Sequence, residues 1–176
     1  NGILVASPAN PTGSMVDKET LKNLINTAHE NNVSFISDEI YHGIQYENNP
    51  TTALEITDKC YVINSFSKYF SMTGWRIGWM IVPEDHVRQV ERLSQNLFIC
   101  PPHVSQLTAL SAMDANIELN ENVNVYKKNR EILLEELPKA GLGKFSPPDG
   151  AFYIYVDISK YSNESLNFCK EVLDKA

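Results

Sequence analysis

Four short apolar runs, each ending in polar turn residues, divide the first half of the chain. Segments with helical periodicity or turn-forming residues separate them, so that strand-like and helix-like stretches alternate. Alternation of this kind predicts an α/β fold in which a mostly parallel sheet is flanked by helices on both faces. The four runs cover residues 3–6, 33–37, 61–64 and 77–82.

Helix boundaries can be placed at several points. Asp17 precedes apolar residues at helical spacing, and we expect it to cap a helix that ends near Asn31 and Asn32. A second helix is expected to start in "PEDHVRQVERL" (83–93), whose valines and leucine fall on one face. Residues 118–137 have the pattern of one long helix with a charged outer face.

This long helix indicates how the chain divides into domains. It is expected at residues 118–140, between part of a large domain (1–117) and the beginning of a smaller α/β domain (141–176). In the last part, "GKFSPPDGAFYIYVDIS" (143–159) predicts a turn between two strands, followed by a final helix. The chain starts without methionine and its first strand begins within three residues, so we expect an internal fragment whose small domain is truncated.

Charge and cysteine usage narrow the class of protein. The net charge of −7 and the pI near 5.1 argue against a nucleic-acid surface, which needs clustered lysine and arginine. The three cysteines include no CxxC pair, so neither disulfides nor a zinc site is predicted, and reduced thiols favour a cytoplasmic location. The histidines lack metal-ligand spacing, and no apolar run approaches the ~18 residues of a membrane span. A small-molecule ligand is the expected partner.

Polar residues that follow the predicted strands are the candidates for chemistry. Ligands of open α/β sheets bind beyond the carboxyl ends of the strands, where these residues would meet. Each has an ordinary structural explanation when taken alone: "NPTG" favours a β-turn, an aspartate or serine often caps a helix, and a lone lysine is usually solvated. The candidates are Asn10, Asp38, Tyr41, Ser65, Ser67, Lys68 and Arg76.

Taken together, these residue types fit a phosphorylated aromatic aldehyde held next to an amine. Serine hydroxyls and the planar guanidinium of Arg76 suit a phosphate group. Lys68 can act as a nucleophile toward a carbonyl carbon. An aspartate such as Asp38 can keep a pyridine nitrogen protonated, so that the ring withdraws electrons. Tyr41 and Asn10 can hydrogen-bond a phenolate oxygen.

Several stretches of the chain resemble the class I/II aminotransferases, which depend on pyridoxal 5′-phosphate and share the aspartate aminotransferase fold, fold type I. The resemblance extends over essentially the whole chain, in the family's order. It implies a large cofactor-binding domain, a smaller α/β domain beyond it, and transfer of an amino group between an L-amino acid and a 2-oxo acid by a homodimer. The stretches are "NPTG", "SDEIYHGIQYE", "SFSKYFSMTGWRIGW", "PPHVSQLTALSAM" and "PPDGAFYIYVDIS".

The resemblance also implies a role for each candidate. Lys68 would form the Schiff base with the cofactor and later move a proton, and Asp38 would pair with the pyridinium nitrogen. Tyr41 and Asn10 would bind O3′ of the cofactor. The phosphate would be held by Ser65, Ser67 and Arg76.

Side chains close to the candidates in sequence are expected to lie outside the site. Trp75 and Trp79 flank a predicted strand, so we expect them in the hydrophobic core. His42 follows Tyr41 directly, and an exposed position is expected for it.

The same sequence features leave other functions open. A pyridoxal-phosphate-dependent carbon–sulfur lyase or a cyclopropane-forming synthase would use the same scaffold. An aminotransferase-like sensor domain of a transcription regulator would carry a helix-turn-helix upstream. The family's glycine-rich turn, stacking aromatic residue and partner-lent tyrosine belong to its amino-terminal half, and its carboxylate-binding arginine follows the region of "GAFYIYVDIS" (150–159). The identity of the substrate is therefore not predicted.

Overall fold

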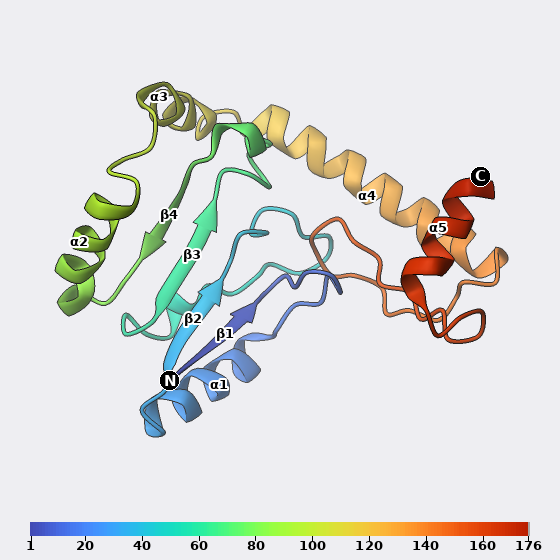
Figure 1. Ribbon diagram of the computed structural model, residues 1–176, viewed down its shortest axis with the longest axis horizontal. Helices are drawn as coiled ribbons and strands as arrows, with labels where there is room; N and C mark the ends of the chain where they lie inside the picture. The colour runs from blue at the N-terminus through green and yellow to red at the C-terminus, as the bar shows by residue number, and fades with distance from the viewer. Residues whose placement is uncertain (176) are drawn as a thin grey trace.

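A four-stranded mixed sheet forms the centre of the computed structural model, which describes residues 1–175 (Figure 1). The strands β1 (Gly2–Ala6), β2 (Ser34–Asp38) and β3 (Tyr61–Ser65) are parallel and adjacent in chain order. The fourth strand, β4 (Gly78–Ile81), pairs with β3 in the antiparallel direction. The predicted mostly parallel sheet is therefore confirmed, with an antiparallel strand at one edge.

Helix α1 (Lys18–Glu30) packs its apolar side on the sheet. Asp17 caps it as predicted, because its carboxylate accepts hydrogen bonds from the backbone N–H and the hydroxyl of Thr20, which also lower the pKa of Asp17. Asn31 is the C-cap residue. The core between this helix and the sheet consists of Leu21, Ile25, Ala28, Phe35, Ala53, Cys60 and Val62.

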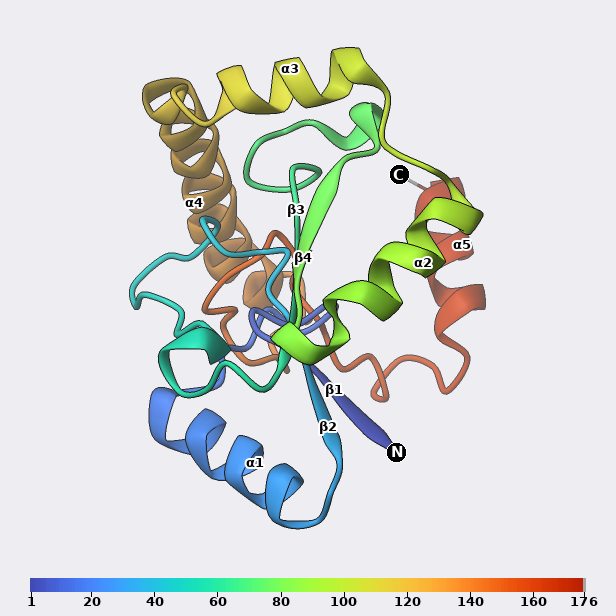
Figure 2. The same cartoon turned by 90° about the vertical axis from the view of Figure 1, so that its left-hand side faces the viewer.

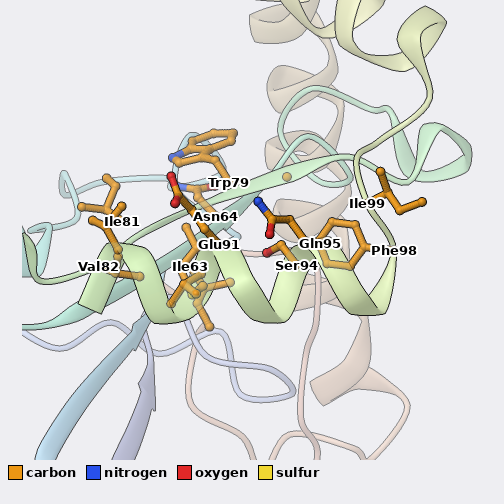
Figure 3. Close-up of a pocket in the computed structure, with 14 residues that line it drawn as sticks. Ile63, Asn64, Trp79, Ile81, Val82, Glu91, Ser94, Gln95, Phe98 and Ile99 are labelled. Atoms are coloured by element: carbon orange, nitrogen blue, oxygen red, sulfur yellow. The ribbon is translucent and has the colours of Figure 1, made fainter. Parts of the chain in front are cut away.

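Helix α2 (Val87–Leu97) follows a 3₁₀ turn, η3 (Glu84–His86), and lies on the opposite side of the sheet from α1 (Figure 2). None of its residues is buried against the described part of the chain. An open groove of about 940 Å³ separates it from β3 and β4, lined by side chains such as Ile63, Trp79 and Gln95 (Figure 3). A helix thus lies on each face of the sheet, as predicted, but only the face covered by α1 is closely packed.

Helix α4 (Asn116–Lys139) is the predicted long helix, which begins two residues before the expected range of 118–140 and ends one residue before its end. It runs from α3 (His103–Ala112) toward α5 (Ser165–Lys175) (Figure 1). Two further 3₁₀ turns, η1 (Ala53–Glu55) and η2 (Thr73–Trp75), lie in the connections between strands.

The two strands predicted within residues 143–159 do not form. This part of the chain takes part in two isolated bridges, between Phe145 and Val156 and between Gly150 and Gln45. The backbone N–H groups of Asp149 and Gly150 both donate to the carbonyl of Gly13 instead, each at 2.9 Å. The prolines before this turn have no backbone N–H to donate to a neighbouring strand. The segment therefore forms a loop and not part of a sheet.

A small second core lies beside the turn that follows β3. It contains Phe66 and Met72, and the ring of Trp79 packs edge-on against Phe66 at a centroid distance of 5.0 Å. The core position predicted for Trp79 fits this arrangement. The one predicted for Trp75 is wrong: Trp75 is 40% exposed, because it lies in the turn η2 and not beside a strand.

Within residues 1–175, no helix combines the length and the apolar character needed to cross a membrane. The same residues hold no group of three or more side chains suited to a metal ion. Cys60, Cys100 and Cys169 are free thiols.

Candidate active site

The candidate residues lie at the end of the sheet where the parallel strands finish. The register places Asp38 opposite Ala6 on one side and opposite Ile63 on the other, so the loops after β1, β2 and β3 begin at the same edge. Strand β4 runs the other way, and the residues just before it lie at this edge too. All seven candidates belong to these loops or strand ends: Asn10, Asp38, Tyr41, Ser65, Ser67, Lys68 and Arg76.

The ammonium group of Lys68 lies against two aromatic rings. Its ammonium nitrogen is 5.4 Å from the ring centroid of Tyr41 and 5.7 Å from that of Phe152. The two rings meet edge to face, with their centroids 5.6 Å apart. No carboxylate of residues 1–175 forms an ion pair with this ammonium group. The amine is therefore held against aromatic rings at the site, with no carboxylate partner in the described chain.

The loop that carries Lys68 is closed by its own hydrogen bonds. The backbone N–H of Phe66 donates to the carbonyl of Ile77 at 3.2 Å, and the hydroxyl of Thr73 donates to the carbonyl of Ser67 at 2.8 Å. No α-helix follows directly, so the two serines do not cap one. The hydroxyl oxygen of Ser65 instead accepts a hydrogen bond from the backbone N–H of Ser67 at 3.0 Å.

Arg76 closes this loop in a left-handed backbone conformation, with φ of 51°. One guanidinium nitrogen, Nη1, donates to the carbonyl of Thr73 at 2.9 Å. An arginine has five N–H donors, so most of them remain free for an anion. Together with the serine hydroxyls of the same loop, this exposed guanidinium forms a donor set that suits a phosphate group.

The loop after β2 carries Asp38 and Tyr41. Asp38 is half-buried, and its Oδ1 accepts a hydrogen bond from the backbone N–H of Ile40 at 3.3 Å, which leaves the other carboxylate oxygen available. Tyr41 is only 2% exposed, and its hydroxyl lies 2.7 Å from the hydroxyl of Tyr153. Burial raises the pKa of Tyr41, as do the bond to Tyr153 and the charge of Asp38, while the side chain of Asn10 opposes the rise.

Glu39, which the sequence reasoning did not single out, anchors this loop. It is 3% exposed, and its Oε1 accepts hydrogen bonds from the hydroxyls of Ser37 and Thr52 and the backbone N–H of Ala53 at 2.8 to 3.1 Å. Its Oε2 lies 3.4 Å from Nδ1 of His42. Glu39 thereby ties the end of β2 to Thr52 and Ala53, which lie thirteen and fourteen residues after Glu39 in the chain.

The exposed position expected for His42 is wrong, because its side chain contributes to the same network. Its side chain is 17% exposed, and Nε2 lies 3.1 Å from the carbonyl oxygen of Ser7 in the loop after β1. Burial lowers the pKa of His42, while the charge of Glu39 acts in the opposite direction. The imidazole therefore links two of the loops that form the site.

A segment from the far end of the chain completes the site. Gly13 approaches this segment so closely that a Cβ atom on it would lie 2.4 Å from Cβ of Pro148. The hydroxyl of Tyr46 donates to the carbonyl of Ala151. These contacts bring Phe152 and Tyr153 to Lys68 and Tyr41. Phe152 and Tyr153 belong to one of the stretches that resemble the family, but no feature of the sequence distinguishes them from aromatic residues of a hydrophobic core.

A comparison with protein families decides which family this site belongs to. The family model described as "Aminotransferase class I and II" matches residues 1–176, the entire chain. The chain belongs to the class I and II aminotransferase family. Members of this family depend on pyridoxal 5′-phosphate, and the fold is the aspartate aminotransferase fold, type I.

Characterised relatives of this aminotransferase chain carry related names. It is 44% identical over 176 residues to the valine–pyruvate aminotransferase of Mycobacterium tuberculosis, covering 98% of this chain and 45% of the relative. It is 34% identical over 176 residues to the aspartate aminotransferase of Thermotoga maritima, with the same coverage of 98% and 45%. The chain thus spans about half the length of the curated relatives it matches.

Solved structures agree with the fold of this aminotransferase chain. A Silicibacter pomeroyi crystal structure, named provisionally as an aminotransferase, superposes with a TM-score of 0.96 at 61% identity, covering 99% of this chain and 47% of that one. The Thermotoga maritima aspartate aminotransferase superposes with a TM-score of 0.90 at 33% identity, covering 98% and 45%. These comparisons lend no support to the lyase, synthase or sensor alternatives.

The residues of the site fit pyridoxal 5′-phosphate by their chemistry. A primary amine without a carboxylate partner suits the carbonyl group, and a half-buried carboxylate suits the ring nitrogen. Hydroxyl and amide groups after β1 and β2 suit the phenolic oxygen, and the loop with two serines and an arginine suits the phosphate. Each part of the cofactor therefore has a complementary group at this edge of the sheet.

Proposed function

We propose that the full-length protein containing this chain is an aminotransferase that moves an amino group between an L-amino acid and a 2-oxo acid. The observation that carries the proposal is the position of Lys68. Its ammonium lies against the rings of Tyr41 and Phe152, without a carboxylate partner in the described chain, and Asp38 and Arg76 lie at the same edge of the sheet. A single amine at this place, among groups that suit each part of the cofactor, is what amino transfer requires.

Lys68 has two tasks in this proposal. Its primary amine would hold pyridoxal phosphate by condensing with the aldehyde of the cofactor, with loss of water. Once the amino group of a substrate replaces it, the free Nζ of Lys68 would act as the base that accepts the proton of the substrate's Cα and as the acid that returns it. Bound pyridoxal phosphate supplies the electron sink that makes this Cα proton acidic.

The remaining candidates hold and polarise the cofactor. The carboxylate of Asp38 keeps a proton on the ring nitrogen, which maintains the positive charge of the ring. Tyr41 and Asn10 donate hydrogen bonds to O3′. Ser65, Ser67 and Arg76 bind the phosphate, and the backbone hydrogen bonds of their loop keep them in place.

The proposal extends to the organisation of the whole protein. Residues 1–117 would belong to the cofactor-binding domain, 118–140 to an interdomain helix and 141–176 to the start of the small domain. The course of α4 between α3 and α5 supports this division (Figure 1). A homodimer is proposed from the family resemblance, with amino-acid metabolism, biosynthesis included, as its role, and the free thiols support a cytoplasmic location.

Absorbance spectroscopy on the full-length protein tests the proposed reaction. Pyridoxal phosphate is added first, and then each of a panel of L-amino acids, with no oxo-acid acceptor. We expect at least one amino acid to remove the visible absorbance while one equivalent of its 2-oxo acid is released. Release of pyruvate and ammonia from a β-substituted amino acid, without that stoichiometric oxo acid, would establish a lyase and overturn the proposal. Absorbance that persists with every amino acid would overturn it as well.

A further inference from the structure

Tyr41 and Tyr153 form a hydroxyl pair inside the site. Their oxygen atoms are 2.7 Å apart although the residues lie 112 positions apart in the chain. Their rings meet edge to face, at a centroid distance of 5.8 Å and an interplanar angle of 78°. The proposed function gives a role to Tyr41 but none to Tyr153.

Backbone hydrogen bonds anchor the segment of Tyr153, in addition to the contact between the two hydroxyls. Its segment is bound to the loop after β1 by the two hydrogen bonds from Asp149 and Gly150 to Gly13. It is also bound to the loop after β2, because the backbone N–H of Ala151 donates to the carbonyl of Ile44 at 2.9 Å. These backbone hydrogen bonds therefore hold the Tyr153 hydroxyl next to the hydroxyl of Tyr41.

The number of protons on the two hydroxyls restricts how the pair can work. Each phenol has one O–H donor and two lone pairs that accept. In the absence of a ligand, either oxygen of the pair can be the donor. Once Tyr41 donates its only proton to O3′, it can interact with Tyr153 only as the acceptor. Tyr153 must then donate, and the hydrogen bonds run in one direction from Tyr153 through Tyr41 to the ligand.

We propose that Tyr153 is a positioning residue that donates a hydrogen bond to Tyr41 and so strengthens the bond from Tyr41 to O3′. Hydrogen bonds that run in one direction polarise one another, so a donor behind Tyr41 makes its own O–H a better donor. This inference rests on the proposed function, in which Tyr41 binds O3′. It adds a residue from the carboxyl-terminal segment to the control of the cofactor's electronics.

The test compares single-hydroxyl deletions in the full-length protein loaded with pyridoxal phosphate. The variants are Tyr153→Phe, Tyr41→Phe, the double variant, and Tyr155→Phe as a matched control. Tyr155 belongs to the same segment and is 62% exposed, so its replacement removes a hydroxyl away from the site. The readouts are the pH midpoint of the visible absorbance change and the dissociation constant of the cofactor. Asp38 and Lys68, the charged groups beside Tyr41, stay unchanged in every variant.

The expected shift has a definite sign. Weaker donation from Tyr41 leaves more negative charge on O3′, where it stabilises the proton on the neighbouring nitrogen, so the midpoint moves to higher pH. We expect Tyr153→Phe to raise it by about half a unit, the size of one net hydrogen bond, and Tyr41→Phe to raise it further. The double variant should match Tyr41→Phe alone, because Tyr153 acts through Tyr41. Tyr155→Phe should leave it unchanged.

Failure of this inference is distinguishable from failure of the proposed function. If Tyr41→Phe shifts the midpoint but Tyr153→Phe does not, or if their effects add in the double variant, the role of Tyr153 is refuted. A shift to lower pH in Tyr153→Phe would also refute it, because Tyr153 would then compete for the Tyr41 proton as an acceptor. If Tyr41→Phe itself has no effect, the assignment of Tyr41 to O3′ fails, and the inference fails with it.

Discussion

Gly43 lies directly against the ring of Tyr69. A Cβ atom at position 43 would be 2.4 Å from Cγ and 2.5 Å from Cδ2 of that ring, and φ of Gly43 is +97°. Gly43 belongs to the loop that carries Asp38 and Tyr41, and Tyr69 directly follows Lys68. The two loops that supply these groups are therefore packed together at a point where only glycine fits.

Replacement of Gly43 by alanine should disturb both the fold and the site. The left-handed φ and the overlap with Tyr69 both oppose a side chain, so we expect the free energy of unfolding to fall by about 1–3 kcal/mol. Gly74→Ala is the control, since a Cβ there meets no atom within 4 Å. Urea unfolding of the two full-length variants measures the difference. Equal stability of Gly43→Ala and Gly74→Ala would show that the contact does not constrain the loops.

Glu39 should be important for stability although it is not proposed to touch the cofactor. Glu39→Ala leaves the donors of Ser37, Thr52 and Ala53 without their acceptor in the interior, and we expect a loss of about 2–4 kcal/mol in the free energy of unfolding. Glu30→Ala is the control, because Glu30 is exposed at the end of α1 and should contribute less than about 0.5 kcal/mol. Chemical denaturation measures both. A loss at Glu39 no larger than at Glu30 would contradict the anchoring role.

Asp38→Asn separates the charge of this residue from its place in the turn. Asparagine keeps an oxygen that can accept the bond from Ile40, but it removes the negative charge proposed to face the ring nitrogen. We expect kcat of the full-length enzyme to fall by roughly 10²–10³-fold with a smaller change in KM, as for the loss of one electrostatic contact to a reacting system. Asp58→Asn, at an exposed aspartate, should leave kcat unchanged. Near-normal kcat in Asp38→Asn would contradict the assigned role.

Cys60 makes the free energy of unfolding depend on pH in the alkaline range. Burial, together with the charges of Glu39 and Asp58, raises the pKa of its thiol from the ordinary 9.0 to about 11. The folded protein therefore holds this proton more tightly than the unfolded chain does. The resulting stabilisation is complete below pH 9.0 and is lost as the pH rises through about 11.

Urea unfolding measured across this pH range tests the role of Cys60. The wild-type protein should lose stability more steeply than Cys60→Ser, whose hydroxyl does not titrate there. Identical slopes for the two proteins would show that the thiol does not contribute.

The fold was largely predictable because its signals are local. The cap at Asp17, the alternation of strands and helices, and the long helix α4 each depend on residues close together in sequence, and all three are confirmed. The failures arise where distant contacts decide the local structure. Residues 143–159 have strand-like composition, but their backbone groups bind the loop after β1. Trp75 has the character of a core residue, yet the turn η2 exposes it.

The residues of the candidate site divide in the same way, into those that local sequence features identify and those that only distant contacts identify. The seven residues could be collected from the sequence because each one follows, or lies just before, a strand at one edge of the sheet. Glu39, Phe152 and Tyr153 could not be assigned roles in this way. Their importance lies in contacts across the chain, which neither periodicity nor spacing records.

The central claim is that Lys68 is the amine that binds pyridoxal phosphate. The most direct test is to load the full-length protein with the cofactor, reduce it with borohydride, digest it and locate the modified lysine by mass spectrometry. The account predicts one phosphopyridoxyl group per chain, on the peptide that contains Lys68, and none in a Lys68→Ala variant. Modification of a different lysine, or equal labelling of the Lys68→Ala variant, would contradict it.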